Sequence, residues 1–235
     1  DAFCRDNDAV ARRAHGITLT PTLLVEAMLG ALKDESFDTI VDAGAGSGRF
    51  AIAAAARWPR AQVLAVESHP QVAALLRQRV RESGLASRIE VIERDFREFE
   101  APATGRTLYL GNPPYVRHHD IDAAWKEGYA KGMAARGIRA SQLAGLHAHF
   151  VLAATQCMRE GDALCFVTAA EWLDNGYGSA LRSLLSQADG PGLRGLWVAD
   201  AGQPVFSDAL VSSVVLWAQR CEAAQAVMGR IAERA

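Results

Sequence analysis

The stretch FDTIVDAGAGSG, residues 37–48, decides the fold. An apolar run suited to a buried strand leads directly into a turn that contains Gly44, Gly46 and Gly48. Glycine lets the backbone turn tightly and approach a ligand closely. The alanine-rich run RFAIAAAARWP, residues 49–59, then predicts a helix. A strand, a glycine turn and a helix in this order predict an α/β domain in which the helix N-terminus favours a polar or anionic group.

The spacing of these glycines excludes two common phosphate sites. The pattern is GxGxG, which lacks the third glycine of the dinucleotide fingerprint GxGxxG. No GK[ST] follows the turn, and this excludes a phosphate-cradling P-loop. The ligand of the turn must therefore be inferred from residues elsewhere in the chain.

Strands and helices alternate outward from this stretch. The further predicted strands are residues 61–68, 88–95, 106–110 (followed by GNPPY), 162–169, 193–200 and 210–220, and the clearest further helices are residues 20–33, 70–84 and 175–187. The tract from Ile121 to Arg159 is predicted to be mostly helical, with Gly128, Gly132 and Gly137 indicating a loop or lid in its first half. The alternation predicts one α/β domain over residues 1–235, with a doubly wound, mainly parallel sheet.

The composition is that of an ordinary soluble protein, with 50% hydrophobic and 22% charged residues and a net charge of −2. This charge gives no global attraction to nucleic acid, so such a contact needs a local basic face or residues outside this chain. The scattered Cys4, Cys157, Cys165 and Cys221 form no CxxC pair and are interpreted as reduced thiols. With no signal peptide and no bilayer-spanning run, we expect a cytoplasmic protein. Because the chain begins at Asp1, we interpret it as a trimmed or partial chain.

Carboxylates follow the second and third predicted strands. Glu67 ends the second, about twenty residues past the glycine turn, where a carboxylate can hold both hydroxyls of a ribose. Asp95 ends the third and can accept from an adenine amino group, while Phe96 offers an apolar wall. Strand-end side chains of an open α/β sheet point into one crevice. Together with Asp42, these residues predict a nucleoside site.

The fourth predicted strand runs into Asn112-Pro113-Pro114-Tyr115, where neither proline can extend a sheet. An exocyclic amino or amide nitrogen is a poor nucleophile because its lone pair is delocalised. Two acceptors, the Asn112 side-chain carbonyl and the Pro113 backbone carbonyl, would favour its reactive pyramidal form. The prolines hold both acceptors fixed. Tyr115 can stack on a flat substrate.

With these motifs the sequence resembles the class I S-adenosylmethionine-dependent methyltransferases. The resemblance implies a seven-stranded sheet with the last strand antiparallel. It also implies an N-terminal cofactor-contact region over 1–35, a cofactor-binding half over 36–110 and a catalytic half over 111–235. GITLTPTLLVEAML, residues 16–29, resembles the motif that reaches the cofactor carboxylate. The cofactor-binding residues implied are Thr20, Pro21, Asp42, Ala43, Gly44, Gly46, Glu67, Ser68, Asp95, Phe96 and Asn112.

Cofactor motifs followed by NPPY resemble the gamma-type N6-adenine DNA methyltransferases of restriction–modification systems. The resemblance implies in-line methyl transfer to an adenine flipped out of double-stranded DNA, sandwiched between Tyr115 and Phe206. Arg117 and His118, with the basic residues that follow them, are candidates for phosphate contacts. This chain departs from the family because no target-recognition domain follows the catalytic part. We therefore expect that such a domain lies outside this chain, that a partner subunit supplies it, or that the enzyme acts on another substrate.

Three alternatives remain open. A protein glutamine-N5 methyltransferase carries the same NPPY, because an amide nitrogen poses the same lone-pair problem. RNA adenine methylation is a second alternative, intermediate between DNA and protein methylation. The third, a non-catalytic methyltransferase-like subunit, is a different class of protein. No metal and no membrane partner is expected, since His118-His119-Asp120 diverge and methyl transfer needs no metal.

Overall fold

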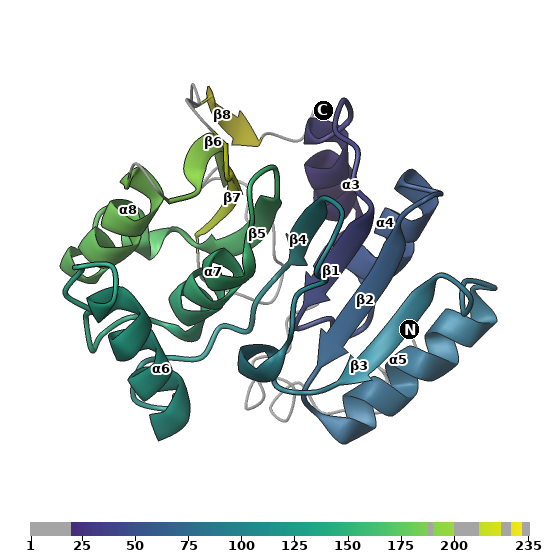
Figure 1. Ribbon diagram of the computed structural model, residues 1–235, viewed down its shortest axis with the longest axis horizontal. Coiled ribbons are helices and arrows are strands. Elements are labelled where there is room, and N and C mark those ends of the chain that lie inside the picture. Colours follow the sequence, from purple (N-terminus) through teal and green to yellow (C-terminus); the bar gives the residue numbers. More distant parts are fainter. Residues whose placement is uncertain (1–19, 188–189, 200–211, 222–226, 232–235) are drawn as a thin grey trace.

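The structure is a computed structural model that describes residues 20–187, 190–199, 212–221 and 227–231. Its centre is one sheet with the strand order β3-β2-β1-β4-β5-β7-β6-β8 (Figure 1). The strands are β1 (Thr39–Ala43), β2 (Gln62–Glu67), β3 (Ile89–Glu93), β4 (Thr107–Gly111), β5 (Ala163–Ala169), β6 (Gly192–Ala199), β7 (Ser213–Gln219) and β8 (Val227–Ile231).

The strand directions confirm the predicted class. Strands β3, β2, β1, β4 and β5 are parallel, and β7 is inserted antiparallel to both β5 and β6. These seven strands form the Rossmann-like sheet that the resemblance implies. The eighth strand was not predicted: β8 pairs parallel with the outer side of β6 and extends the edge. Its sequence, VMGRI, is short and contains a glycine, so it carries a weak strand signal.

Helices cover both faces of the sheet (Figure 1). They are α3 (Thr22–Ala31), α4 (Arg49–Arg57), α5 (Pro70–Glu82), α6 (Ala123–Ala134), α7 (Leu146–Cys157) and α8 (Ser179–Ser186), with short 3-10 turns η1 (Phe96–Glu98), η2 (Ala170–Leu173) and η3 (Gly176–Gly178). Alternate residues of the strands enter two separate cores: Leu108 and Leu110 face α3, α4 and α5, while Tyr109 faces α6, α7 and α8. This alternation follows from the two-residue period of a strand. None of the described helices is long and apolar enough to cross a bilayer.

The prediction of a loop at Gly128 and Gly132 is wrong. Gly128 and Gly132 lie inside α6, and of the three glycines only Gly137 lies in the connection, with φ of +68°. Packing explains Gly132, because a Cβ there would lie 2.5 Å from Nε2 of Gln156 and 2.9 Å from Leu152 on α7. A missing side chain therefore lets α6 approach α7 closely and does not mark a turn.

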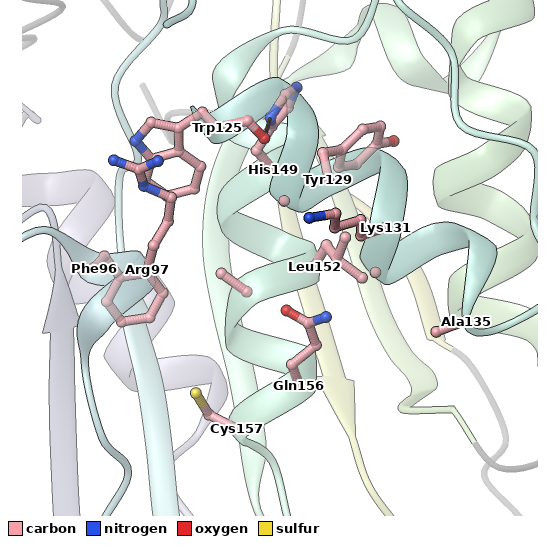
Figure 2. A pocket seen from close by; sticks show the side chains of 13 residues that line it. Phe96, Arg97, Trp125, Tyr129, Lys131, Ala135, His149, Leu152, Gln156 and Cys157 are labelled. Atoms are coloured by element: carbon pink, nitrogen blue, oxygen red, sulfur yellow. Dashed lines mark hydrogen bonds between the residues drawn. The ribbon is translucent and has the colours of Figure 1, made fainter. Parts of the chain in front are cut away.

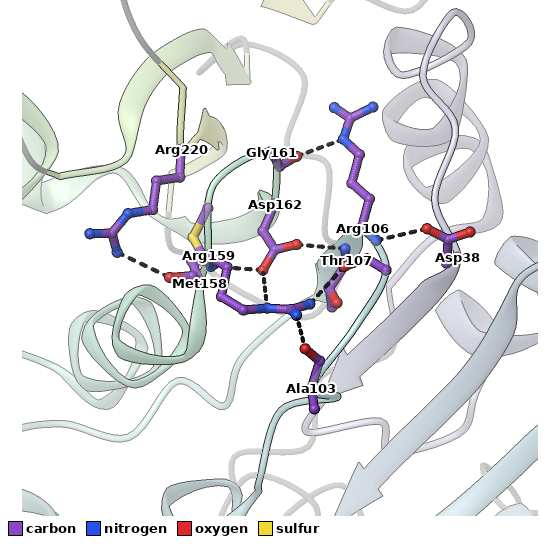
Figure 3. A network of polar contacts seen from close by, with 10 residues as sticks. Asp38, Ala103, Arg106, Thr107, Met158, Arg159, Gly161, Asp162 and Arg220 are labelled. Carbon is purple, nitrogen blue, oxygen red and sulfur yellow. Dashed lines mark hydrogen bonds and ion pairs between the residues drawn. The ribbon is translucent and has the colours of Figure 1, made fainter.

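A buried carboxylate links the amino ends of β4 and β5 (Figure 3). NPPY follows the other, carboxyl end of β4. Asp162 is 0% exposed and accepts from the backbone N–H of Thr107 at 2.7 Å and of Arg159 at 2.8 Å. Its Oδ2 also lies 3.7 Å from Nε of Arg159. The Arg159 guanidinium in turn donates to the carbonyls of Ala103 and Gly105. One side chain thus ties the first residue of β4 to the segment that follows α7.

Replacing this carboxylate should lower stability without a change of shape. Asp162→Asn keeps the volume but puts an amide where two N–H groups donate, so we expect a loss of about 2–3 kcal/mol in the free energy of unfolding. The measurement is urea unfolding, with Asp174→Asn, at an exposed position, as control. Equal stability of Asp162→Asn and the wild type would contradict the role given to this carboxylate.

Candidate active site

The glycine turn and the NPPY turn lie against each other at the carboxyl ends of β1 and β4. The N–H groups of Gly44 and Ala45 donate to the Val66 carbonyl at 3.0 and 2.9 Å, which fixes the turn against β2. Gly44 has φ of +73°, and a Cβ there would lie 3.4 Å from Cδ of Pro114 and 3.6 Å from the ring of Phe150. Glycine is therefore favoured here by the backbone angle, while a Cβ would just reach van der Waals contact with Pro114 and Phe150.

The acids at the ends of β1 and β2 brace this turn. Asp42 is 0% exposed, and its Oδ2 accepts from the N–H of Ala51 in α4 at 2.9 Å. Burial raises the pKa of Asp42 well above its ordinary value; the Ala51 hydrogen bond lowers it and the Glu67 charge raises it. Glu67 accepts from the N–H groups of Gly46 and His69, both at 2.9 Å. Oδ1 of Asp42 has no partner among the described residues.

The predicted acid after β3 is paired with a cation. Asp95 accepts from the Arg97 N–H at 2.9 Å and from Nη2 of Arg97 at 2.6 Å. The Arg97 guanidinium lies 5.0 Å from the ring centre of Trp125 (Figure 2). Trp125 stacks on Phe150 at 4.8 Å, and Phe150 stacks on Phe96 at 5.3 Å. An aromatic column capped by Arg97 thus stands beside Asp95.

A cavity of about 150 Å³ lies between the glycine turn, NPPY and this column. It is lined by Gly44, Val66, Ser68, Arg94, Asp95, Phe96, Pro114, Val116, Trp125, Leu146 and Phe150. The structure therefore brings together Gly44, Ser68, Asp95 and Phe96, as the sequence predicts. Trp125, Leu146 and Phe150 were missed because they belong to helices, where aromatic and apolar residues read as core.

Asn112 stands at the end of β4 with its amide oriented. Its Nδ2 donates to Oγ1 of Thr20 at 3.1 Å, and Thr20 is buried just before α3. The Thr20 carbonyl in turn accepts from Nη1 of Arg49 at 2.6 Å. The Asn112 oxygen, Oδ1, is buried and accepts no hydrogen bond from any described residue. A buried acceptor without a donor is costly, so this oxygen is a candidate for contact with a substrate.

Tyr115 is held between α7 and β7. Burial raises the pKa of its hydroxyl, and a hydrogen bond with Ser213 opposes that shift. Its ring centre lies 6.3 Å from that of His147, which is buried at the start of α7. Burial, with a smaller effect of His149, lowers the pKa of His147 to about 4, so this imidazole is neutral near pH 7. Tyr115 is therefore supported by polar but uncharged neighbours.

The other predicted residues are distributed around the site. Pro21 immediately precedes α3, and Ala43 is the buried last residue of β1. Arg117 is exposed and His118 half-buried just after NPPY. Phe206 lies outside the described residues. Within the described part of the chain, no three His, Cys, Asp or Glu side chains are grouped as metal ligands would be.

Comparisons with known proteins agree with this geometry. A family model described as Methyltransferase domain matches residues 40–131. The type II methyltransferase M.XamI of Xanthomonas campestris pv. amaranthicola is 47% identical over 72% of this chain. The release factor glutamine methyltransferase of Moorella thermoacetica is 36% identical over 40% of it. The chain spans 33% of the length of each relative.

A structural neighbour supports the fold. The match to the DrdV–DNA complex covers 97% of this chain and 29% of the DrdV chain, with a TM-score of 0.68 and 14% sequence identity. The chain belongs to the class I S-adenosylmethionine-dependent methyltransferases.

The described residues of this methyltransferase fit S-adenosylmethionine. The cavity has the apolar and aromatic walls that an adenine ring needs, with the polar Ser68 and Asp95 at its edge. The buried Oδ1 of Asp42 has no partner among the described residues, so a further hydrogen-bond acceptor is available close to the glycine turn. Whether Glu67 also holds the ribose stays a prediction, because both its oxygens already accept backbone N–H groups.

Removing the Trp125 wall should weaken cofactor binding. An aromatic pair contributes about 0.5–1.5 kcal/mol beyond area burial, so Trp125→Ala should raise the Kd for S-adenosylmethionine roughly two- to tenfold. Trp125→Phe keeps a ring at the stacking position on Phe150 and should bind nearly as the wild type. Calorimetry measures both, with thermal unfolding to verify that α6 stays folded. An unchanged Kd for Trp125→Ala would show that this ring is no wall of the cofactor site.

Proposed function

We propose that this chain is the catalytic domain of an enzyme that methylates the exocyclic N6 of adenine in DNA. The observation that carries the proposal is the buried Asn112 oxygen, which has no donor among the described residues and is aimed by the bond from Nδ2 to Thr20. An N–H of an amino group is the complement of this oxygen. The similarity to M.XamI supports DNA as the carrier of that group.

The fixed acceptors would act on the lone pair of the target nitrogen. A hydrogen bond to Oδ1 of Asn112, and a second to the Pro113 carbonyl, draws the N–H groups out of conjugation and favours the pyramidal nitrogen. Because the turn is rigid and Asn112 is held by Thr20, little reorganisation is needed during the reaction. Tyr115, held through Ser213 and His147, would stack on the base.

The charge balance asks for no strong base before transfer. S-adenosylmethionine, when bound, supplies a methyl group on a positively charged sulfur. The neutral nitrogen forms the new N–C bond as the S–C bond breaks, and the positive charge moves from sulfur to nitrogen. One of its two N–H protons then leaves to water, and the remaining N–H donates to either Asn112 or Pro113. The lowered pKa of His147, about 4, makes its neutral imidazole a weak base, in agreement with a mechanism that needs no strong base before transfer.

A second candidate, methylation of a protein glutamine amide, is supported by four relatives that are release factor glutamine methyltransferases. Release factor glutamine methyltransferases match 40–71% of this chain at 29–36% identity, whereas M.XamI matches 72% of it at 47% identity. A glutamine amide also presents N–H groups to the Asn112 oxygen. The higher identity to M.XamI over a similar share of the chain favours DNA.

The substrate that receives a labelled methyl group distinguishes the two candidates. The full-length protein is given S-adenosylmethionine labelled in the methyl group, with unmethylated plasmid DNA and a release factor in one reaction. The proposal predicts label in DNA that is recovered as N6-methyladenine after nucleoside digestion. Label in the release factor alone would establish the second candidate and overturn the first.

Asn112→Ala should remove the acceptor and spare the cofactor site. Loss of one preorganised hydrogen-bonding group in an active site lowers kcat by about 10²–10³ fold, and we expect a loss of this size in DNA methylation. The Kd for S-adenosylmethionine should change by less than about threefold, since Asn112 does not line the cavity.

Asn112→Asp is the matched variant. It keeps an oxygen at the same place and should retain more activity than Asn112→Ala. If Asn112→Ala methylates adenine at the wild-type rate, the role given to this side chain is wrong.

A further inference from the structure

The connection between α6 and α7, residues 135–145, lies beside the NPPY turn. The N–H of Leu146 donates to the Val116 carbonyl at 3.0 Å, and a Cβ on Gly145 would lie 3.5 Å from the same carbonyl. Leu146 itself lines the cofactor cavity, and the next residue, His147, contacts Tyr115. Side chains that project from this connection therefore stand close to the opening where a substrate base would enter.

The connection is anchored on both sides of one exposed leucine. Ile138 and Ala144 are buried, while Leu143 is 57% exposed. The Leu143 N–H donates to Oγ of Ser141 at 3.2 Å, and the Ala144 N–H donates to the Ser141 carbonyl at 3.4 Å. The backbone is thus fixed in a turn that holds the Leu143 side chain outward. A fixed, outward leucine differs from one on a loose loop, which could fold back onto the surface.

The connection that carries Leu143 is basic in sequence. Residues 135–145 contain Arg136 and Arg139 and no Asp or Glu, in a chain whose net charge is −2. Arg139 and Arg117 are both exposed, and neither side chain has an ion pair or a hydrogen bond with any described residue. Free cations on this connection and on the NPPY turn complement phosphates on either side of a bound duplex.

Resting on the proposed function, we propose that Leu143 enters the duplex at the place that the target adenine vacates, with Arg139 and Arg117 on the flanking phosphates. Flipping a base breaks its pairing and its stacking. An apolar wedge placed between base steps offsets part of this cost, as it does in proteins that kink DNA. The anchored turn delivers the wedge from the residues next to the catalytic site.

The test compares two DNA substrates in the full-length protein. Sequencing of DNA methylated by the wild type gives the target adenine. Duplexes are then made with this adenine opposite thymine or opposite an abasic site, where no pair must be broken. Leu143→Ala should lower kcat/KM on the paired duplex roughly tenfold and on the abasic duplex by less than about twofold, because a wedge assists only the costly flip.

The control variant is Leu75→Ala, which truncates a leucine that is 44% exposed on α5 and should leave both substrates unchanged. Equal rates of Leu143→Ala and the wild type on the paired duplex would overturn the inference. So would equal losses on the two duplexes, which would indicate a general contact with DNA. If the wild type methylates no DNA at all, the proposed function itself fails, and this outcome is recognised before any variant is compared.

Discussion

The close approach of two strand ends is the constraint on which the site depends. Gly111 ends β4 with φ of +148°, and a Cβ there would lie 3.0 Å from the Ala43 carbonyl and 3.2 Å from Oδ1 of Asp42. Gly44 makes the matching approach to Pro114 from the other side. The backbone angles at both positions disfavour a side chain, and a Cβ on Gly111 would crowd the Ala43 carbonyl, so the cofactor turn and the NPPY turn lie in direct contact. A methyl donor and its acceptor need this proximity.

The polar groups around this contact divide into two kinds. The Glu67 and Asp95 carboxylates and Asp42 Oδ2 accept protein N–H groups and stabilise the turns. The Asn112 oxygen is buried without a donor among the described residues. In a low-dielectric site such an oxygen is costly in the free protein and strongly favours a matching donor. The fold thus maintains an unsatisfied acceptor beside a cofactor cavity, and this is the physical basis of the proposed selectivity for an amino group.

Much of the fold was predictable, because apolar strands alternate with alanine- or leucine-rich helices, and the glycine turn marks the first crossover. The prediction failed where packing decides: Gly132 lies in a helix because α7 is close, and the short β8 depends on pairing with β6. In the site, strand-end residues such as Asp95 were predictable. Trp125 and Phe150 reach the cavity from helices, and the Asn112–Thr20 bond spans 92 residues, so no local pattern indicates either.

The most direct test of this account measures methyl transfer in Thr20→Val and Thr20→Ser with saturating S-adenosylmethionine. Valine keeps the shape of threonine but removes the hydroxyl that accepts from Asn112. We expect kcat to fall roughly tenfold in Thr20→Val, because the amide loses its orientation, and to stay within about twofold in Thr20→Ser. A Thr20→Val enzyme with wild-type kcat would contradict the claim that an oriented Asn112 oxygen activates the target nitrogen.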